Sequence, residues 1–239
     1  MEYTAQQIHE KLINEYEIRS KSGQISFGFG DFPVIIKKSD VVGNVMQEWM
    51  HNWLEHHKVD FAPSQNTQMP PDFYLSPDDR KVGLLEIKAF NAARGPGFDI
   101  ADFRMYANEI VSNPYILDAD YLVFKYRMED GEVAIADLWC KKVWQITCSS
   151  TKWPLKLQVK RGTVHKIRPG TFYSSRAKFK QFCCKEDFIS ALEQTIHQNP
   201  ETRNSLSGQW QNRFLDSYQA HYDVRLQIPR WSDIESAYR

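Results

Sequence analysis

Three charged side chains, Asp72, Glu86 and Lys88, lie in stretches that are otherwise apolar. The stretch 83–90 has the composition of a buried strand, in which only Glu86 and Lys88 interrupt the apolar residues. Side chains alternate faces along a strand, so these two share a face. Burying a carboxylate and an ammonium is costly unless further groups complete the set. Two carboxylates beside an ammonium suit a hard divalent cation and its water.

A carboxylate-x-Lys triplet alone carries little weight, because ordinary composition yields roughly two of them by chance in a chain this long. The chain contains such a decoy at Asp79–Arg80–Lys81, beside a second Pro–Asp at Pro77–Asp78. These lie in "SPDDRK", which has turn composition. Asp72 and Glu86 flank that turn, and two antiparallel strands joined by it bring both carboxylates to one end of a sheet. The alternative is a structural salt bridge between Glu86 and Lys88.

Apolar periodicity and turn residues predict the elements that position these side chains. Between residues 39 and 128 the expected order is helix, strand, strand, strand, helix, strand. The predicted helices are 4–20, 39–57 (capped by Ser39), 100–111, 185–199, 205–221 and a C-terminal one. The predicted strands are 24–30 (or a hairpin arm), 59–62, 72–75, 82–90, 120–128 and 132–140, with further short strands in the following segment.

Composition indicates a soluble globular protein: 239 residues, of which 42% are hydrophobic and 25% charged. We expect no membrane span, because the apolar runs are short, and a cytoplasmic location, because the N-terminus lacks the features of a signal peptide. The four cysteines, with no C-x-x-C pair, are interpreted as ordinary thiols.

The net charge of zero hides an asymmetry along the chain. Residues 138–185 contain twelve Lys and Arg residues and no Asp or Glu, with aromatic residues among them. A folded segment of this composition is typical of a surface that binds nucleic acid. The alternative is a solvated basic face.

The motif "PPD" at 70–72, followed by "EIK" at 86–88 within this element order, resembles the PD-(D/E)xK nuclease superfamily. The strings "SDVVGNVMQEW", "NTQMPPDFYL", "LLEIKAF", "GFDIADFRMYANEI" and "KWPLKLQVKRGTVHKIRP" resemble the Type II restriction endonucleases of the NgoBV/NlaIV family. The resemblance implies an α/β fold with a central mixed sheet flanked by helices. It also implies a single domain over residues 1–239, with a catalytic core at about 39–128 and the basic DNA-contacting segment at about 138–185.

The activity that the resemblance implies is Mg²⁺-dependent hydrolysis of double-stranded DNA by a homodimer, at the palindrome GGNNCC and centrally within it. Asp72 and Glu86 are then metal ligands, and the carbonyl of Ile87 is a third. Lys88 orients or deprotonates the attacking water and neutralises the phosphate. Glu48, on the long helix, completes the metal shell through water or faces solvent. The rival interpretations are a non-specific or repair nuclease, and a DNA-binding module with a degenerate nuclease core.

Within the basic segment, we expect DNA contacts from Lys160, Arg161, His165, Lys166 and Arg168, since Arg and Lys bridge two acceptors of guanine. Gln158–Val159–Lys160 imitates a catalytic triplet but has no upstream acid in its segment, so we assign it to DNA contact. Asp99 and Asp102 are interpreted as caps at the start of the helix 100–111.

Overall fold

The computed structural model describes residues 1–66 and 68–239. These fall into two compact units. Unit 1 comprises residues 1–65, 71–98 and 120–141, and unit 2 comprises the described residues of 66–70 together with 99–119 and 142–239. The prediction of a single domain stays a prediction. No helix within the described ranges is both long and apolar enough to cross a membrane.

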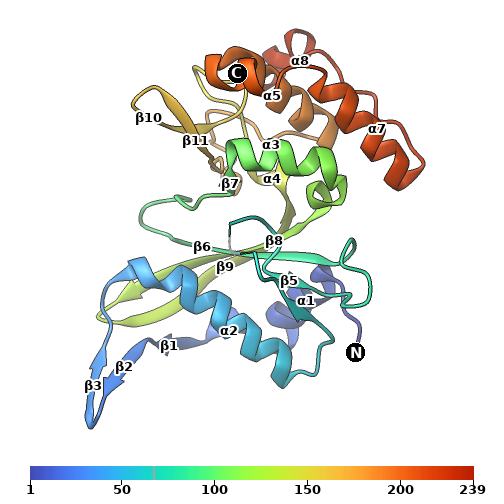
Figure 1. The fold of residues 1–239 in the computed structure, drawn as a ribbon. Coiled ribbons are helices and arrows are strands. Elements are labelled where there is room, and N and C mark those ends of the chain that lie inside the picture. Colours follow the sequence, from blue (N-terminus) through green and yellow to red (C-terminus); the bar gives the residue numbers. More distant parts are fainter. Residues whose placement is uncertain (67) are drawn as a thin grey trace. The chain divides into compact units, whose positions relative to one another are not determined.

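Unit 1 is built on a six-stranded mixed sheet with the strand order β1-β9-β8-β6-β5-β4 (Figure 1). Strands β6 and β8 are parallel, whereas β5 runs antiparallel to both β4 and β6. The strands are β1 (Ser22–Gln24), β4 (Ala62–Pro63), β5 (Phe73–Tyr74), β6 (Leu84–Asn91), β8 (Asp120–Glu129) and β9 (Glu132–Lys142). The central strands β6 and β8 are largely buried on both faces, as expected of strands that are covered on both sides.

Helix α2 (Val42–His56) packs on β6, and α1 (Ala5–Glu10) lies against β8. The apolar stripe of α2 is buried in one core with the sheet, as the periodicity predicts. Two predicted helix boundaries in unit 1 are wrong. The first helix is regular only to Glu10 and continues as a π-helical turn to Glu15, and Ser39 begins a 3₁₀ turn rather than capping α2.

A separate two-stranded hairpin precedes α2. It consists of β2 (Ser26–Phe29) and β3 (Phe32–Ile35), which pair antiparallel. The hairpin arm predicted at 24–30 is therefore confirmed.

Unit 2 contains a three-stranded sheet with the order β10-β11-β7, covered by helices. Its strands are β7 (Ala101–Asp102), β10 (Leu157–Lys160) and β11 (Thr163–Ile167). Its helices are α3 (Phe103–Ser112), α4 (Val143–Ile146), α5 (Lys185–Gln198), α6 (Pro200–Ser205), α7 (Trp210–Tyr222) and α8 (Trp231–Tyr238). The indole N–H of Trp210 in α7 donates to the carbonyl of Ala107 in α3 at 2.7 Å, which ties these two helices together. The element order predicted from 39 to 128 is confirmed, with the two-residue β7 added before α3.

Candidate active site

The backbone of Asp72 is fixed beside Glu86 by the β5–β6 ladder. Phe73 pairs with Leu85, and the Asp72 N–H donates to the Leu85 carbonyl at 3.0 Å. On the other side, the Asp72 carbonyl accepts from the Ser64 N–H at 2.8 Å. Both backbone hydrogen bonds of Asp72 belong to the sheet, so its side chain has a defined direction.

Both carboxylate oxygens of Asp72 are engaged. Oδ2 accepts from the backbone N–H of Ile87 at 2.7 Å, and Oδ1 accepts from the side-chain amide of Gln47 at 2.8 Å. Gln47 comes from α2, so this helix and strand β6 hold the carboxylate from two directions.

Glu86 and Lys88 project from the same face of β6, as the period of two predicts. Lys88 Nζ lies 2.6 Å from Glu86 Oε1, and Glu86 is only 4% exposed. The other oxygen of this carboxylate, Oε2, is buried and has no hydrogen-bond partner among the described residues. A buried, unpaired oxygen of this kind is costly in the isolated protein and calls for a further partner.

Burial raises the pKa of Asp72 from 3.8 to about 7, and the nearby negative charge of Glu86 adds to the effect. The hydrogen bond from Ile87 and the charge of Lys88 oppose it. The two negative charges of this largely buried site are therefore poorly compensated by Lys88 alone. The donor set, carboxylate oxygens with one orphaned acceptor, fits a hard divalent cation such as Mg²⁺.

The other residues expected at the metal site are placed as follows. Glu48 is exposed, and the α2 residue that contacts Asp72 is its neighbour Gln47. The N–H of Ile87 is used by Asp72, and the role of its carbonyl as a ligand stays a prediction, as does that of Glu48. The decoys Asp78 and Asp79 are exposed in the turn before β6, where Asp79 accepts from the Lys81 N–H.

Sequence reasoning missed Gln47. The available signal was its position on α2, three residues before the fully buried Met50 and seven before the fully buried Leu54. That spacing puts a polar amide at the edge of the stripe that faces the sheet. The resemblance to the nuclease superfamily indicated Glu48 instead, because many of its members carry a glutamate on this helix.

In unit 2, two of the short strands predicted in the basic segment pair with each other as a hairpin. Strands β10 and β11 are joined by Arg161–Gly162, both with positive φ, the geometry of a tight two-residue turn. Lys160 and Arg161 are exposed at this turn, and His165 is half-buried.

Lys166 and Arg168 are half-buried and paired with acids. Lys166 Nζ lies 3.7 Å from Asp102 Oδ2, and Arg168 is bonded to Asp99. Asp102 also caps α3, because its side chain accepts from the N–H groups of Arg104 and Met105, which confirms that interpretation. Asp99 was wrongly interpreted as a cap, since its carboxylate binds Arg168 instead.

Comparisons with known proteins show the family to which the chain belongs. Residues 2–238 match the family model described as NgoBV restriction endonuclease. The chain is 53% identical to the Type II restriction enzyme NlaIV of Neisseria lactamica over 238 residues, which is 99% of this chain and 98% of that protein. It is 50% identical to the Type II restriction enzyme NgoBV of Neisseria gonorrhoeae over 159 residues, which is 66% of this chain and 90% of that protein.

A solved structure titled NlaIV restriction endonuclease superposes with a TM-score of 0.95 at 52% identity, covering 100% of this chain and 98% of that one. The mixed α/β fold expected from the motif order is thereby confirmed. The chain therefore belongs to the NgoBV restriction endonuclease family and is a Type II restriction endonuclease, a phosphodiester hydrolase.

Proposed function

We propose that the protein cuts double-stranded DNA as a Mg²⁺-dependent homodimer at the palindrome GGNNCC. The observation that carries the proposal is the cluster of Asp72, Glu86 and Lys88. Two carboxylates and an ammonium lie together where β5 pairs with β6, and one buried carboxylate oxygen is left without a partner among the described residues. The palindrome follows from the family resemblance, and a two-fold site is normally met by a two-fold protein.

Asp72 and Glu86 would hold the metal, because their oxygens are of the hard type that Mg²⁺ prefers. A Mg²⁺ ion held there supplies Lewis-acid stabilisation of the charge that develops on the phosphate. Gln47 and the Ile87 N–H orient Asp72 for this purpose, since each donates to one of its oxygens.

Lys88 acts on the water and the phosphate. Its ammonium, held by Glu86 Oε1, can donate to a phosphate oxygen while it keeps the attacking water in line.

The basic hairpin β10–β11 supports contact with DNA. Lys160 and Arg161 are exposed at its turn and suit phosphate contacts. Lys166 and Arg168 are held in place by Asp102 and Asp99, so a contact with guanine requires them to share or exchange these partners.

Digestion of a phage genome with Mg²⁺, followed by mapping of the fragment ends, tests the proposal. We expect discrete fragments whose ends lie at the centre of GGNNCC, and no cutting with a chelator. Ends spread over unrelated sequences would indicate a non-specific or repair nuclease instead. No cutting of any DNA with any divalent metal would indicate a degenerate nuclease core.

A further inference from the structure

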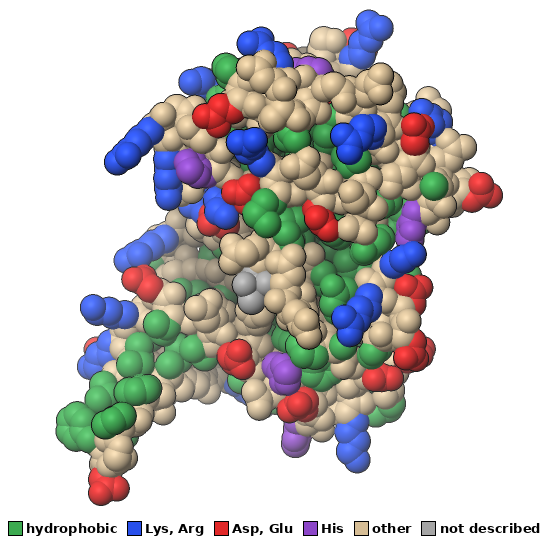
Figure 2. Space-filling view, in the orientation of Figure 1, with side chains coloured by type: hydrophobic (Ala, Val, Ile, Leu, Met, Phe, Trp, Pro, Cys, Tyr) green, Lys and Arg blue, Asp and Glu red, His purple; other side chains and the backbone are tan. Residues whose placement is uncertain are grey.

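The β2–β3 hairpin presents one wholly apolar face to solvent. Its register pairs Phe27 with Val34 and Phe29 with Phe32, so these four side chains share a face. They are 61%, 42%, 84% and 74% exposed, respectively. Figure 2 shows an apolar cluster projecting at the lower left of the view, where Figure 1 places this hairpin. A two-stranded hairpin is at best marginally stable in water on its own, so an exposed apolar face indicates a partner.

The base of the hairpin is anchored while its tip is open. The Ile36 N–H donates to the Ile25 carbonyl at 2.8 Å, and a Cβ added at Gly131 would meet Ile35 at 2.5 Å. At the tip, a Cβ added at Gly28 or Gly30 would meet no atom within 4 Å. The hairpin is therefore a fixed arm whose outer half is not packed on the described part of its own chain.

The charge of the arm argues against nucleic acid as its partner. From Gln24 to Ile36 the chain contains one ionisable side chain, Asp31, which lies in the turn at the tip. A segment with an acid and no cation is repelled by a polyanion, whereas its apolar face suits a protein surface.

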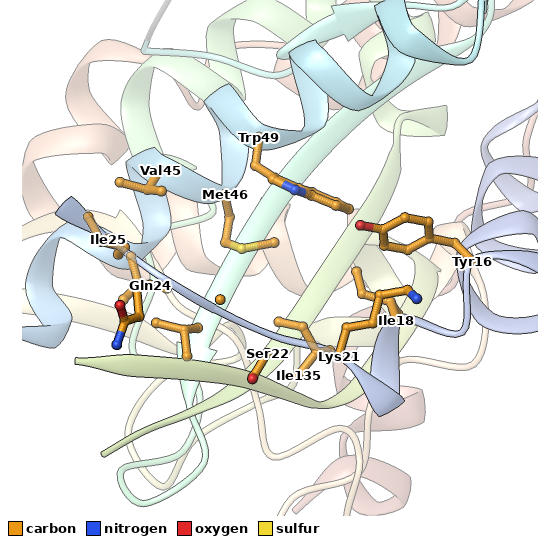
Figure 3. A pocket seen from close by; sticks show the side chains of 13 residues that line it. Tyr16, Ile18, Lys21, Ser22, Gln24, Ile25, Val45, Met46, Trp49 and Ile135 are labelled. Atoms are coloured by element: carbon orange, nitrogen blue, oxygen red, sulfur yellow. The ribbon is translucent and has the colours of Figure 1, made fainter. Parts of the chain in front are cut away.

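An apolar pocket of about 150 Å³ opens beside the base of the same arm. Ile25, which immediately precedes β2, lines it together with Val45, Met46, Trp49 and Tyr16 (Figure 3). A cavity of this size in an apolar setting accommodates a benzene ring. Exposed residues on the rim, among them Lys21 and Gln24, make the pocket reachable from solvent.

We propose that the hairpin is a dimerisation arm that packs on a second copy of this chain and seats Phe29 in the partner's pocket. Two equal arms that lie antiparallel about a two-fold axis place each tip at the other's base, where the pocket opens. The contact is then isologous and closed. The inference deepens the homodimer of the proposed function and rests on that function for its two-fold symmetry.

The area suffices for a stable dimer. At about 200 Å² per aromatic side chain, the three exposed rings present on the order of 400 Å² in each copy. Each arm also covers a comparable area around the partner's pocket, outside the partner's own three rings, so the pair buries roughly 1,600 Å², the size of a standard specific interface.

Light scattering over a range of protein concentrations, without DNA, tests the arm. We expect twice the chain mass of 28.0 kDa for the unmodified protein and the single mass for Phe29→Ser/Phe32→Ser. Both side chains are exposed, so the substitutions should leave the thermal unfolding temperature of the monomer unchanged. The dimer dissociation constant should rise on the order of 100-fold or more. Val82→Ser, which removes another exposed apolar side chain, is the matched control and should stay dimeric.

A pocket variant gives an independent readout. In the Val45→Trp variant the larger side chain should fill the pocket and weaken self-association, while the β2–β3 hairpin is unchanged. Mixed with Phe29→Ser/Phe32→Ser, it should form heterodimers, because one arm and one pocket remain complementary. A monomeric unmodified protein, or an arm variant that dimerises as tightly as the unmodified chain, would overturn the proposal. So would an arm variant that stays dimeric but binds DNA more weakly, which would make the hairpin a DNA contact. Discrete cutting of a phage genome by the unmodified protein is scored separately, so a failed arm leaves the proposed Mg²⁺-dependent cleavage of DNA at GGNNCC standing.

Discussion

Replacing Asp72 with Asn should stabilise the metal-free protein while it abolishes cleavage. Asn is isosteric with Asp, and its oxygen can still accept from the Ile87 N–H that now binds Asp72 Oδ2. Its amide nitrogen can donate to Gln47 if the Gln47 side-chain amide turns over. The substitution thus removes a negative charge from a water-poor site and keeps both hydrogen bonds.

The size of the gain follows from the pKa. The carboxyl of Asp72 titrates at about 7 in the folded protein, against 3.8 when free. Between these pH values the unfolded chain has lost the proton and the folded chain has kept it, so stability falls as pH rises from about 4 to 7 and stays low above. The folded wild type is thus destabilised by up to about 4 kcal/mol above pH 7, and Asp72→Asn should recover most of this.

Urea unfolding in the presence of a chelator, at about pH 4 and about pH 8, measures the difference. We expect nearly equal free energies of unfolding for wild type and Asp72→Asn at the lower pH and a gain for the variant at the higher pH. Asp78→Asn, an exposed aspartate in the neighbouring turn, is the matched control and should show no gain. Adding Mg²⁺ should stabilise the wild type and not Asp72→Asn, because the ion binds the folded wild type alone.

An Asp72→Asn variant that is less stable than wild type at the higher pH, without metal, would refute this reasoning. It would mean that the ionised carboxylate is satisfied by the protein itself. The site would then be a structural salt-bridge cluster.

Three further predictions follow from the same geometry. Lys88→Ala should lower the single-turnover rate by about 10³-fold or more while site-specific binding with metal persists, because its proposed contacts are with water and phosphate; a normal rate would make Lys88 a bystander. Gln47→Ala should slow single-turnover cleavage about 10-fold, because Asp72 loses the amide that orients it. Gln47→Glu should lower the free energy of urea unfolding in chelator, because it places a third carboxylate beside Asp72. If the amide contact had no role, neither variant would differ from wild type. Asp99→Asn should increase the affinity for DNA and steepen its salt dependence, because it releases Arg168 from its ion pair. Arg168→Ala should weaken the free energy of binding to the specific site by about 1–3 kcal/mol and that to unrelated DNA much less. Binding assays over a range of salt concentrations measure both effects.

That Asp72, Glu86 and Lys88 lie close together could be predicted because the signal is local. Glu86 and Lys88 share a face through the period of two, and the turn composition of "SPDDRK" placed Asp72 on the adjoining antiparallel strand. The same rule separated Asp72 and Glu86, which are held by the sheet, from Asp78 and Asp79, which are exposed in the turn.

What could not be predicted depends on contacts far apart in the sequence. Gln47 reaches Asp72 across 25 positions, and Arg168 reaches Asp99 across 69. No periodicity within one element reports such a pair. The composition of the acid-free segment gave no sign of the Arg168–Asp99 pair, because Asp99 and Asp102, which neutralise Arg168 and Lys166, lie outside that segment.

The most direct test of the catalytic assignment is the single-turnover cleavage rate of Glu86→Gln on a duplex with one GGNNCC site, in Mg²⁺. Glu86 is buried beside Lys88 and carries the oxygen left without a partner among the described residues. The glutamine side chain has nearly the same shape as glutamate, so the substitution should remove the charged metal ligand without disturbing the packing. We expect a rate at least about 10³-fold below wild type, with unchanged folding and undiminished stability in chelator. A Glu86→Gln protein that cuts the duplex at a rate near that of wild type would contradict the assignment.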